Sequence, residues 1–174
     1  DGALARDVAR VGHTFAQTGD FMVVVSAWNA DTQAAGTVQV SIVEGITSFV
    51  STNGLHNPPY TSWEAAATNI QSAIDAATVG GTILVDEGTY DQGWSMQSER
   101  RYRIRLWKPV SVVASNENPW ATVIRGAGPH GYSAVGCAYL CSGSSLVGFT
   151  LTDGYTRNSG DDVRHRSGGG AWCE

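Results

Sequence analysis

The sequence predicts an all-β protein in two parts: a partial β-sandwich over residues 1–44 and a solenoid of stacked coils over residues 45–174. Two runs in the first part alternate apolar and polar residues, as half-buried strands do. The second part contains short strands closed by glycine that echo one another as TILVDEG, TVIRG and FTLTDG, which is typical of a solenoid. Only one helix is predicted beside them, which argues against an ordinary α/β domain.

The composition excludes several classes of partner. The 174 residues carry a net charge of −5 and one lysine, so no basic stripe is available to neutralise phosphates and we expect no nucleic-acid partner. No apolar run approaches the ~20 residues of a membrane span, and no signal-peptide pattern opens the chain. The arginines cluster at 100–105 and 157–166, and we interpret both clusters as solvated surface. Because the chain begins without Met inside a β-pattern, we expect a piece of a longer protein.

In the first part, strands are predicted over residues 21–28 and 37–43, with a turn at 29–31 between them. Two or three antiparallel strands of this kind belong to a β-sandwich. The string HTFAQTGDFMVVVSAWN, followed by TVQV, resembles the C-terminal half of a PKD-type immunoglobulin-like (Ig-like) domain. The residues that carry the resemblance are Phe15, Gly19, Phe21, Val23, Val25, Ala27 and Asn29.

Glu44-Gly45 is the predicted linker, and the strongest local signal in the chain follows it: a helix near residues 63–77. Thr61 is a candidate N-cap, and Glu64 follows at the spacing of a capping box. Gly80-Gly81 ends the helix, since glycine adopts the left-handed conformation common at helix C-termini. The apolar stripe that recurs at helical spacing consists of Trp63, Ala66, Ile70, Ala73, Ile74 and Ala77.

Short strands separated by polar turns make up the rest of the second part. Residues 86–89 are predicted to be a turn and 91–102 a polar insertion. Hairpin signals such as Asn-Gly between alternating runs are scarce, which favours the solenoid. A β-sandwich with one stray helix is the alternative. The predicted strands cover residues 46–50, 82–85, 103–106, 109–114, 121–126, 134–141, 145–154 and 171–173.

The strings FVSTNG, TSWEAAATNIQSAIDAA, GGTILVDEGTY, KPVSVVA, VIRG and LVGFTLTDG resemble the N-terminal end of a right-handed parallel β-helix of the pectate-lyase-like superfamily. The resemblance covers residues 46–174. It implies that the helix near 63–77 caps the open end of the coil. Physical reasoning agrees, because that end exposes unpaired strand edges and an apolar cross-section.

The three cysteines leave their pairing open. Cys137 and Cys141 would lie about 13 Å apart on one strand, too far for a disulfide. Cys173 begins the next coil and could stack on either of them. We interpret the cysteines as apolar thiols that fill ladder positions, with a disulfide as the alternative.

Chemistry-bearing clusters are sparse, and the sequence predicts no catalytic, cofactor-binding or metal-ligating residue. Asp161-Asp162, with Arg164, His165 and Arg166, is the one dense polar group. Two carboxylates there could ligate Ca²⁺ through their oxygens, but adjacent residues of a strand face opposite ways. Four aromatic residues in or beside loops are candidates for contact with carbohydrate, and they are Trp94, Trp107, Trp120 and Tyr132.

The resemblances imply a secreted or cell-surface modular bacterial protein, in which an Ig-like module precedes a β-helix. We expect a non-catalytic binding or adhesion role towards polysaccharide. The alternative is a polysaccharide lyase or glycoside hydrolase whose active site lies in coils beyond residue 174. The fold alone does not decide between them, because function depends on sites carried by the scaffold.

Overall fold

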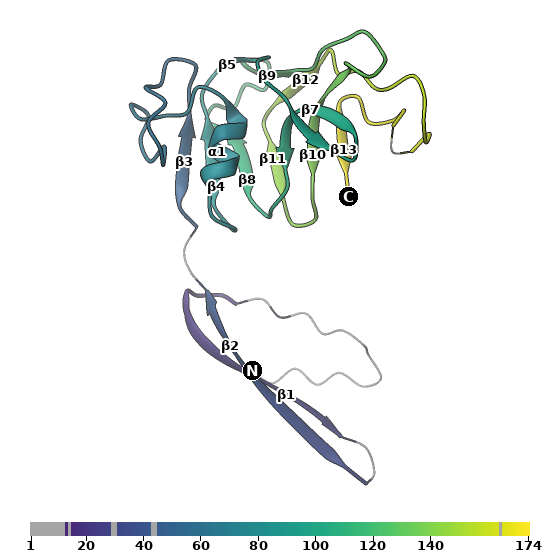
Figure 1. The fold of residues 1–174 in the computed structure, drawn as a ribbon. Helices are drawn as coiled ribbons and strands as arrows, with labels where there is room; N and C mark the ends of the chain where they lie inside the picture. Colours follow the sequence, from purple (N-terminus) through teal and green to yellow (C-terminus); the bar gives the residue numbers. More distant parts are fainter. Residues whose placement is uncertain (1–12, 14, 29–30, 43–44, 164) are drawn as a thin grey trace. The chain divides into compact units, whose positions relative to one another are not determined.

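The computed structural model describes residues 13, 15–28, 31–42, 45–163 and 165–174. The chain divides into two compact units, residues 1–44 and 45–174 (Figure 1). Each unit is described by itself below.

The described residues of the first unit form one pair of antiparallel strands. Strand β1 (Gly19–Trp28) pairs along its whole length with β2 (Gln33–Ile42). Apolar side chains remain exposed, for example those of Met22 and Trp28. The β-sandwich predicted for this unit is represented among the described residues by this two-stranded sheet only. Asn29 of the PKD-like string and the predicted strand end at Val43 lie outside the described residues.

The second unit is a β-solenoid, as the sequence predicted, and it has about four turns (Figure 1). Its strands stack into three sheets, and neighbours within each sheet are parallel except for the pair β6–β7. The first sheet contains β3 (Thr47–Val50), β4 (Thr82–Val85), β8 (Ser111–Ala114) and β11 (Ser145–Val147). The second contains β5 (Gly88–Tyr90), β9 (Thr122–Arg125) and β12 (Thr150–Thr152). The third contains β6 (Ser95–Gln97), β7 (Arg100–Leu106), β10 (Val135–Leu140) and β13 (Ala171–Cys173).

The core lies inside the coil and is built from ladders of apolar residues at matching positions of successive turns. Ile83 is in register with Val112, and Val112 is in register with Leu146. A second ladder joins Tyr90 to Ile124. Because each turn stacks its inward residues on those of the next, one apolar core runs along the solenoid.

Helix α1 is shorter than predicted and spans Ile70–Ala76. The expected N-cap at Thr61 is wrong: the N-cap is Asn69, whose Oδ1 accepts a hydrogen bond from Ser72 N at 2.8 Å. The residues before Asn69 form hydrogen bonds with the first sheet instead. Ala67 pairs with Val50 as an isolated parallel bridge, and Ala67 N donates to Phe49 O at 2.9 Å. The segment before α1 therefore covers the outer edge of β3, and backbone that donates to a strand cannot continue a helix.

Helix α1 itself covers the edge of β7. The Gln71 side chain accepts a hydrogen bond from Arg105 N at 2.7 Å and donates to Arg105 O at 3.3 Å. One amide side chain thus satisfies both backbone groups of a strand residue, as a neighbouring strand would. The buried side of the helix, Ile70, Ala73 and Ile74, faces the core.

Two further elements differ from the sequence prediction. The predicted turn at 86–89 gives way to β5, which pairs with β9. The predicted polar insertion at 91–102 contains β6 and the start of β7, joined by a two-residue turn in which Ser98 and Glu99 both have positive φ. That turn has the backbone of a type I′ hairpin but none of the usual Asn or Gly residues, so its signal was absent from the sequence.

All three cysteines are free thiols. Cys137 is fully buried in the core, which confirms the interpretation of an apolar thiol at that position. Cys173 stacks in register on Leu140 rather than on another cysteine, and its side chain is exposed.

Candidate functional site

A cavity of about 470 Å³ lies between the first two turns of the solenoid, where α1 and the residues before it meet the connection between β5 and β6 and part of β7. Its volume falls in the range of small-molecule sites. The walls combine hydroxyl groups, side-chain amides, one carboxylate, one guanidinium and one indole. They consist of Thr52, Thr68, Ser72, Thr89, Asn69, Gln71, Gln92, Asp91, Arg103 and Trp94, together with Ile70, Tyr90, Gly93 and Ile104. We call this cavity the Trp94 pocket.

Trp94 is the one predicted carbohydrate-contacting residue that lines the Trp94 pocket. Its side chain is half exposed, and the Arg101 guanidinium carbon lies 4.5 Å from the ring centroid. This cation–π contact holds one face of the indole. Trp94 lines the cavity, whereas Arg101 does not.

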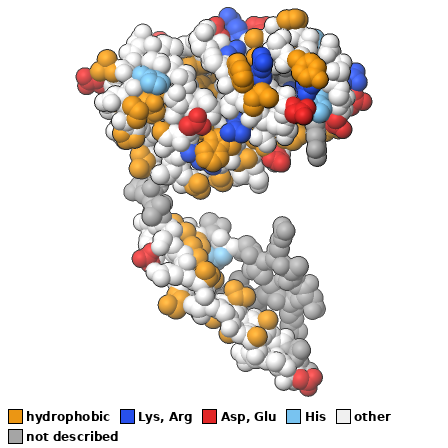
Figure 2. Space-filling model, in the orientation of Figure 1, with side chains coloured by type: hydrophobic (Ala, Val, Ile, Leu, Met, Phe, Trp, Pro, Cys, Tyr) orange, Lys and Arg blue, Asp and Glu red, His pale blue; other side chains and the backbone are white. Residues whose placement is uncertain are grey.

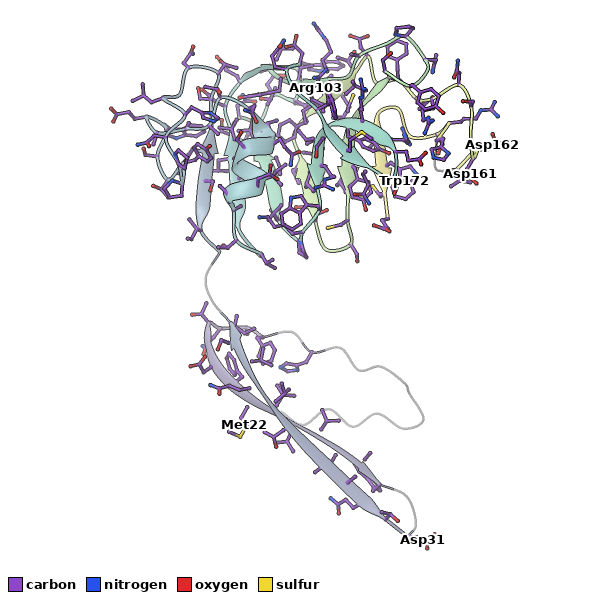
Figure 3. All side chains as sticks on the ribbon, in the orientation of Figure 1. Met22, Asp31, Arg103, Asp161, Asp162 and Trp172 are labelled. Atoms are coloured by element: carbon purple, nitrogen blue, oxygen red, sulfur yellow. The ribbon has the colours of Figure 1, made fainter. Side chains whose placement is uncertain are left out.

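Arg103 forms a buried wall of the pocket. Its Nε donates to Arg125 O at 2.7 Å, and its two terminal nitrogens donate to Gly93 O and Gly126 O. Figure 3 shows this residue within the solenoid unit. Burial lowers the pKa of the guanidinium, an effect opposed by the nearby charge of Asp91. The donors of Arg103 are thus directed at backbone carbonyls and fix the shape of the wall.

The basic cluster at 100–105 is therefore only partly a solvated surface. Arg100 is 3% exposed and Arg103 7% exposed, which corrects the prediction from sequence. Arg157, in the second cluster, is also buried and forms an ion pair with Glu99 at 3.0 Å. Backbone carbonyls from distant parts of the chain make the burial of Arg100 and Arg103 tolerable, because each of these two guanidinium groups donates to at least two of them.

Most of the polar residues that line the Trp94 pocket belong to two segments, residues 68–72 and residues 89–94. Asp91 and Gln92 follow β5, and the Gln92 side-chain amide donates to Asp91 Oδ1 at 2.6 Å. Thr89 of β5 and Ser72 of α1 line the same space. Since a carboxylate accepts and a hydroxyl both donates and accepts, the walls can satisfy a polyhydroxylated ligand.

The other three predicted aromatic residues lie outside the Trp94 pocket. Trp107 donates from Nε1 to Asp75 Oδ1 at 3.0 Å and so packs against α1. Trp120 is 79% exposed in the turn between β8 and β9. Tyr132 is exposed as well, with the Arg157 guanidinium carbon 3.9 Å from its ring centroid.

The acidic pair Asp161-Asp162 lies on an outer loop, separate from Arg103 in Figure 3. Asp162 pairs with Arg166 on the next turn of the loop, and Asp161 Oδ1 accepts from Val163 N at 3.0 Å. Both carboxylates thus have partners within their own loop. Across the described residues, no group of three or more His, Cys, Asp or Glu side chains could hold a metal ion.

Sequence reasoning missed a second cavity, of about 260 Å³, on the third sheet. Three aromatic rings from successive turns line it: Tyr139 and Trp172 are stacked with ring centroids 5.6 Å apart, and Tyr102 is tilted against Tyr139 with ring centroids 5.8 Å apart. The Tyr139 hydroxyl donates to the Glu174 carboxylate, which also borders this cavity. The sequence does place an aromatic residue on three successive turns, at Tyr102, Tyr139 and Trp172. The unequal number of residues between them hides that they are aligned.

Charged side chains of both signs are interspersed with apolar ones on the face shown in Figure 2. Among the described residues, no helix combines the length and the apolar character needed to cross a membrane.

Comparisons with protein-family models, with curated proteins and with solved structures found no match to this chain.

Proposed function

We propose that this chain belongs to a secreted or cell-surface protein that binds polysaccharide without acting on it, and that the Trp94 pocket receives a sugar unit. The observation that carries the proposal is an indole at the wall of a cavity whose other groups are hydroxyls, amides and a carboxylate. A pyranose ring has an apolar face that packs on an aromatic ring and a rim of hydroxyls that need partners. The Trp94 pocket offers both.

The resemblances support the extracellular setting. The solenoid is similar in its strings to right-handed parallel β-helices of the pectate-lyase-like superfamily, and the hairpin β1–β2 carries the PKD-like string. An Ig-like module before a β-helix is the arrangement that the resemblances imply for a modular surface protein.

Binding is favoured over hydrolysis by the number of carboxylates at the site. Glycoside hydrolysis commonly needs two carboxyl groups on either side of the scissile bond. Asp91 is the one carboxylate among the residues that line the Trp94 pocket. A lyase needs a basic side chain that abstracts a substrate proton, and Arg103 of the pocket already donates to three backbone carbonyls.

Substitution of Trp94 tests the proposal. Purified wild-type protein is screened against a panel of neutral and acidic polysaccharides, and affinities for the binders are measured by calorimetry. Trp94→Ala should weaken binding about tenfold, since an aromatic contact contributes roughly 1.5 kcal/mol beyond its buried area. Trp120→Ala is the matched control, because Trp120 is exposed outside the pocket. Equal affinities of wild type and Trp94→Ala would exclude the pocket as the site.

The alternative function, a lyase, is tested on the same preparation. Pectate and alginate are incubated with the protein, with and without Ca²⁺, and unsaturated product is followed by ultraviolet absorbance. We expect a flat trace. A sustained rise would overturn the non-catalytic assignment.

A further inference from the structure

Building on the proposed function, we propose that the Trp94 pocket selects a neutral hexopyranose unit over the corresponding uronic acid, and that Asp91 is the residue that selects. The inference goes beyond polysaccharide binding because it names the charge class of the sugar. It rests on the charges at the walls of the pocket and on how each of them is already engaged.

The only cation that lines the pocket is not arranged to receive a carboxylate. Arg103 is 7% exposed, and each of its three nitrogens donates to a backbone carbonyl: Arg125 O, Gly93 O and Gly126 O. A bidentate grip on a sugar carboxylate uses two parallel N–H groups of the guanidinium. Turning the guanidinium towards a ligand would break bonds that hold the wall and leave buried carbonyls unpaired, which is costly.

The wall facing a ligand carries an acidic group instead. Asp91 lines the cavity and attracts Arg103 electrostatically, so the two formal charges at the site are already matched. A uronate carboxylate would add a second negative charge with no cation free to neutralise it. Burying an unpaired charge, or placing it beside a like one, costs far more than burying a hydroxyl.

A neutral sugar meets favourable partners at the same place. The Asp91 carboxylate can accept hydrogen bonds from sugar hydroxyls, and charge-assisted bonds of this kind are stronger than neutral ones. Thr52, Ser72 and Thr89 also line the cavity, and a hydroxyl can both donate and accept a hydrogen bond. The Arg101 guanidinium lies over the Trp94 ring, and Arg101 does not line the cavity.

The test uses matched probes that differ only at C6. Hexasaccharides of β-1,4-glucan, β-1,4-mannan and α-1,4-glucan are compared with the same chains after oxidation of their C6 hydroxyls to carboxylates. Affinities for the intact protein are measured by calorimetry at a fixed, moderate salt concentration, because screening weakens charge discrimination. We expect each neutral chain that binds to do so at least about tenfold more tightly than its oxidised form.

The variant that isolates the cause is Asp91→Asn, which keeps the shape and removes the charge. It should reduce the ratio of neutral to oxidised affinity to less than about threefold. Glu117→Gln, an exposed change outside the pocket, should keep the wild-type ratio.

The outcomes separate this inference from the proposed function. Oxidised chains that bind wild-type protein as tightly as neutral ones, or an unchanged ratio in Asp91→Asn, would overturn the inference and leave polysaccharide binding intact. If neither these six probes nor the polysaccharide panel binds at all, both the inference and the proposed function fall.

Discussion

Individual polar side chains in the solenoid form cross-links between turns that are distant in sequence. Arg100 donates to Ser167 O and Gly168 O, and Arg103 donates to Arg125 O. Tyr139 is a further example: it is 2% exposed, and its ring stacks on Trp172 of one neighbouring turn and contacts Tyr102 of the other at a tilt. Such residues tie one turn to the next through contacts that apolar ladders cannot make.

Ionisation of Tyr139 should lower the free energy of unfolding at alkaline pH. Burial, followed by the hydrogen bond to Glu174, raises its pKa to about 12. An unfolded tyrosine ionises near 10, so the folded protein holds this proton more tightly. The contribution of Tyr139 is complete below pH 10 and is lost as the pH rises from 10 towards 12. Urea unfolding between pH 8 and 11.5 should show this decline.

Burial raises the pKa values of Tyr90 and Tyr102 as well, so the wild-type decline has several sources. Tyr139→Phe should reduce the decline without abolishing it. If the free energy of unfolding declines with pH as steeply in Tyr139→Phe as in wild type, Tyr139 does not contribute to the decline.

The segment before helix α1 illustrates how an element is redirected by its neighbours. The stretch from Thr61 carries a capping-box pattern, yet it binds the edge of β3, and Trp63 packs on Phe49 with ring centroids 4.8 Å apart. The helix begins only after Asn69. Covering an exposed strand edge outweighs local helix preference, because unpaired edge groups are costly and prone to association.

Two substitutions distinguish the predicted N-cap from the observed one. Asn69→Ala should lower the free energy of unfolding by about 1 kcal/mol, because Ser72 N loses its side-chain acceptor. Thr61→Ala, at an exposed position, should change it by less than about 0.5 kcal/mol. Urea denaturation followed by circular dichroism measures both. A larger loss of stability in Thr61→Ala than in Asn69→Ala would indicate that the helix begins at Thr61, as the capping-box pattern predicts.

At the scale of the whole molecule, stability of the solenoid depends on one continuous core rather than on any single sheet. Inward residues of all three sheets and of α1 belong to one cluster. Turns approach so closely at their corners that a Cβ added to Gly154 would lie 1.9 Å from Gly169 O. Close approach of this kind explains the glycines that follow β9 and β12, Gly126 and Gly154.

A core truncation tests this continuity. Leu106→Ala should destabilise the protein by about 2–5 kcal/mol, since Leu106 is fully buried at the end of β7. Leu55→Ala, at a side chain that is 71% exposed, is the matched control and should change stability by less than about 0.5 kcal/mol. Comparable effects of the two variants in chemical denaturation would argue against a single continuous core.

The sequence by itself determined the solenoid, the boundaries of most of its strands and Trp94 as a candidate contact. The solenoid and its strands follow from local periodicity and from glycines at tight turns, and both patterns can be recognised within a few residues of sequence. The tertiary structure alone decided where α1 begins, that Arg100 and Arg103 are buried, and that Trp94 shares a cavity with Asp91 and not with Trp107, Trp120 or Tyr132. These features depend on strand edges and carbonyls contributed by other turns. Which residues of different turns become neighbours depends on the lengths of the intervening loops, so the sequence alone does not predict it.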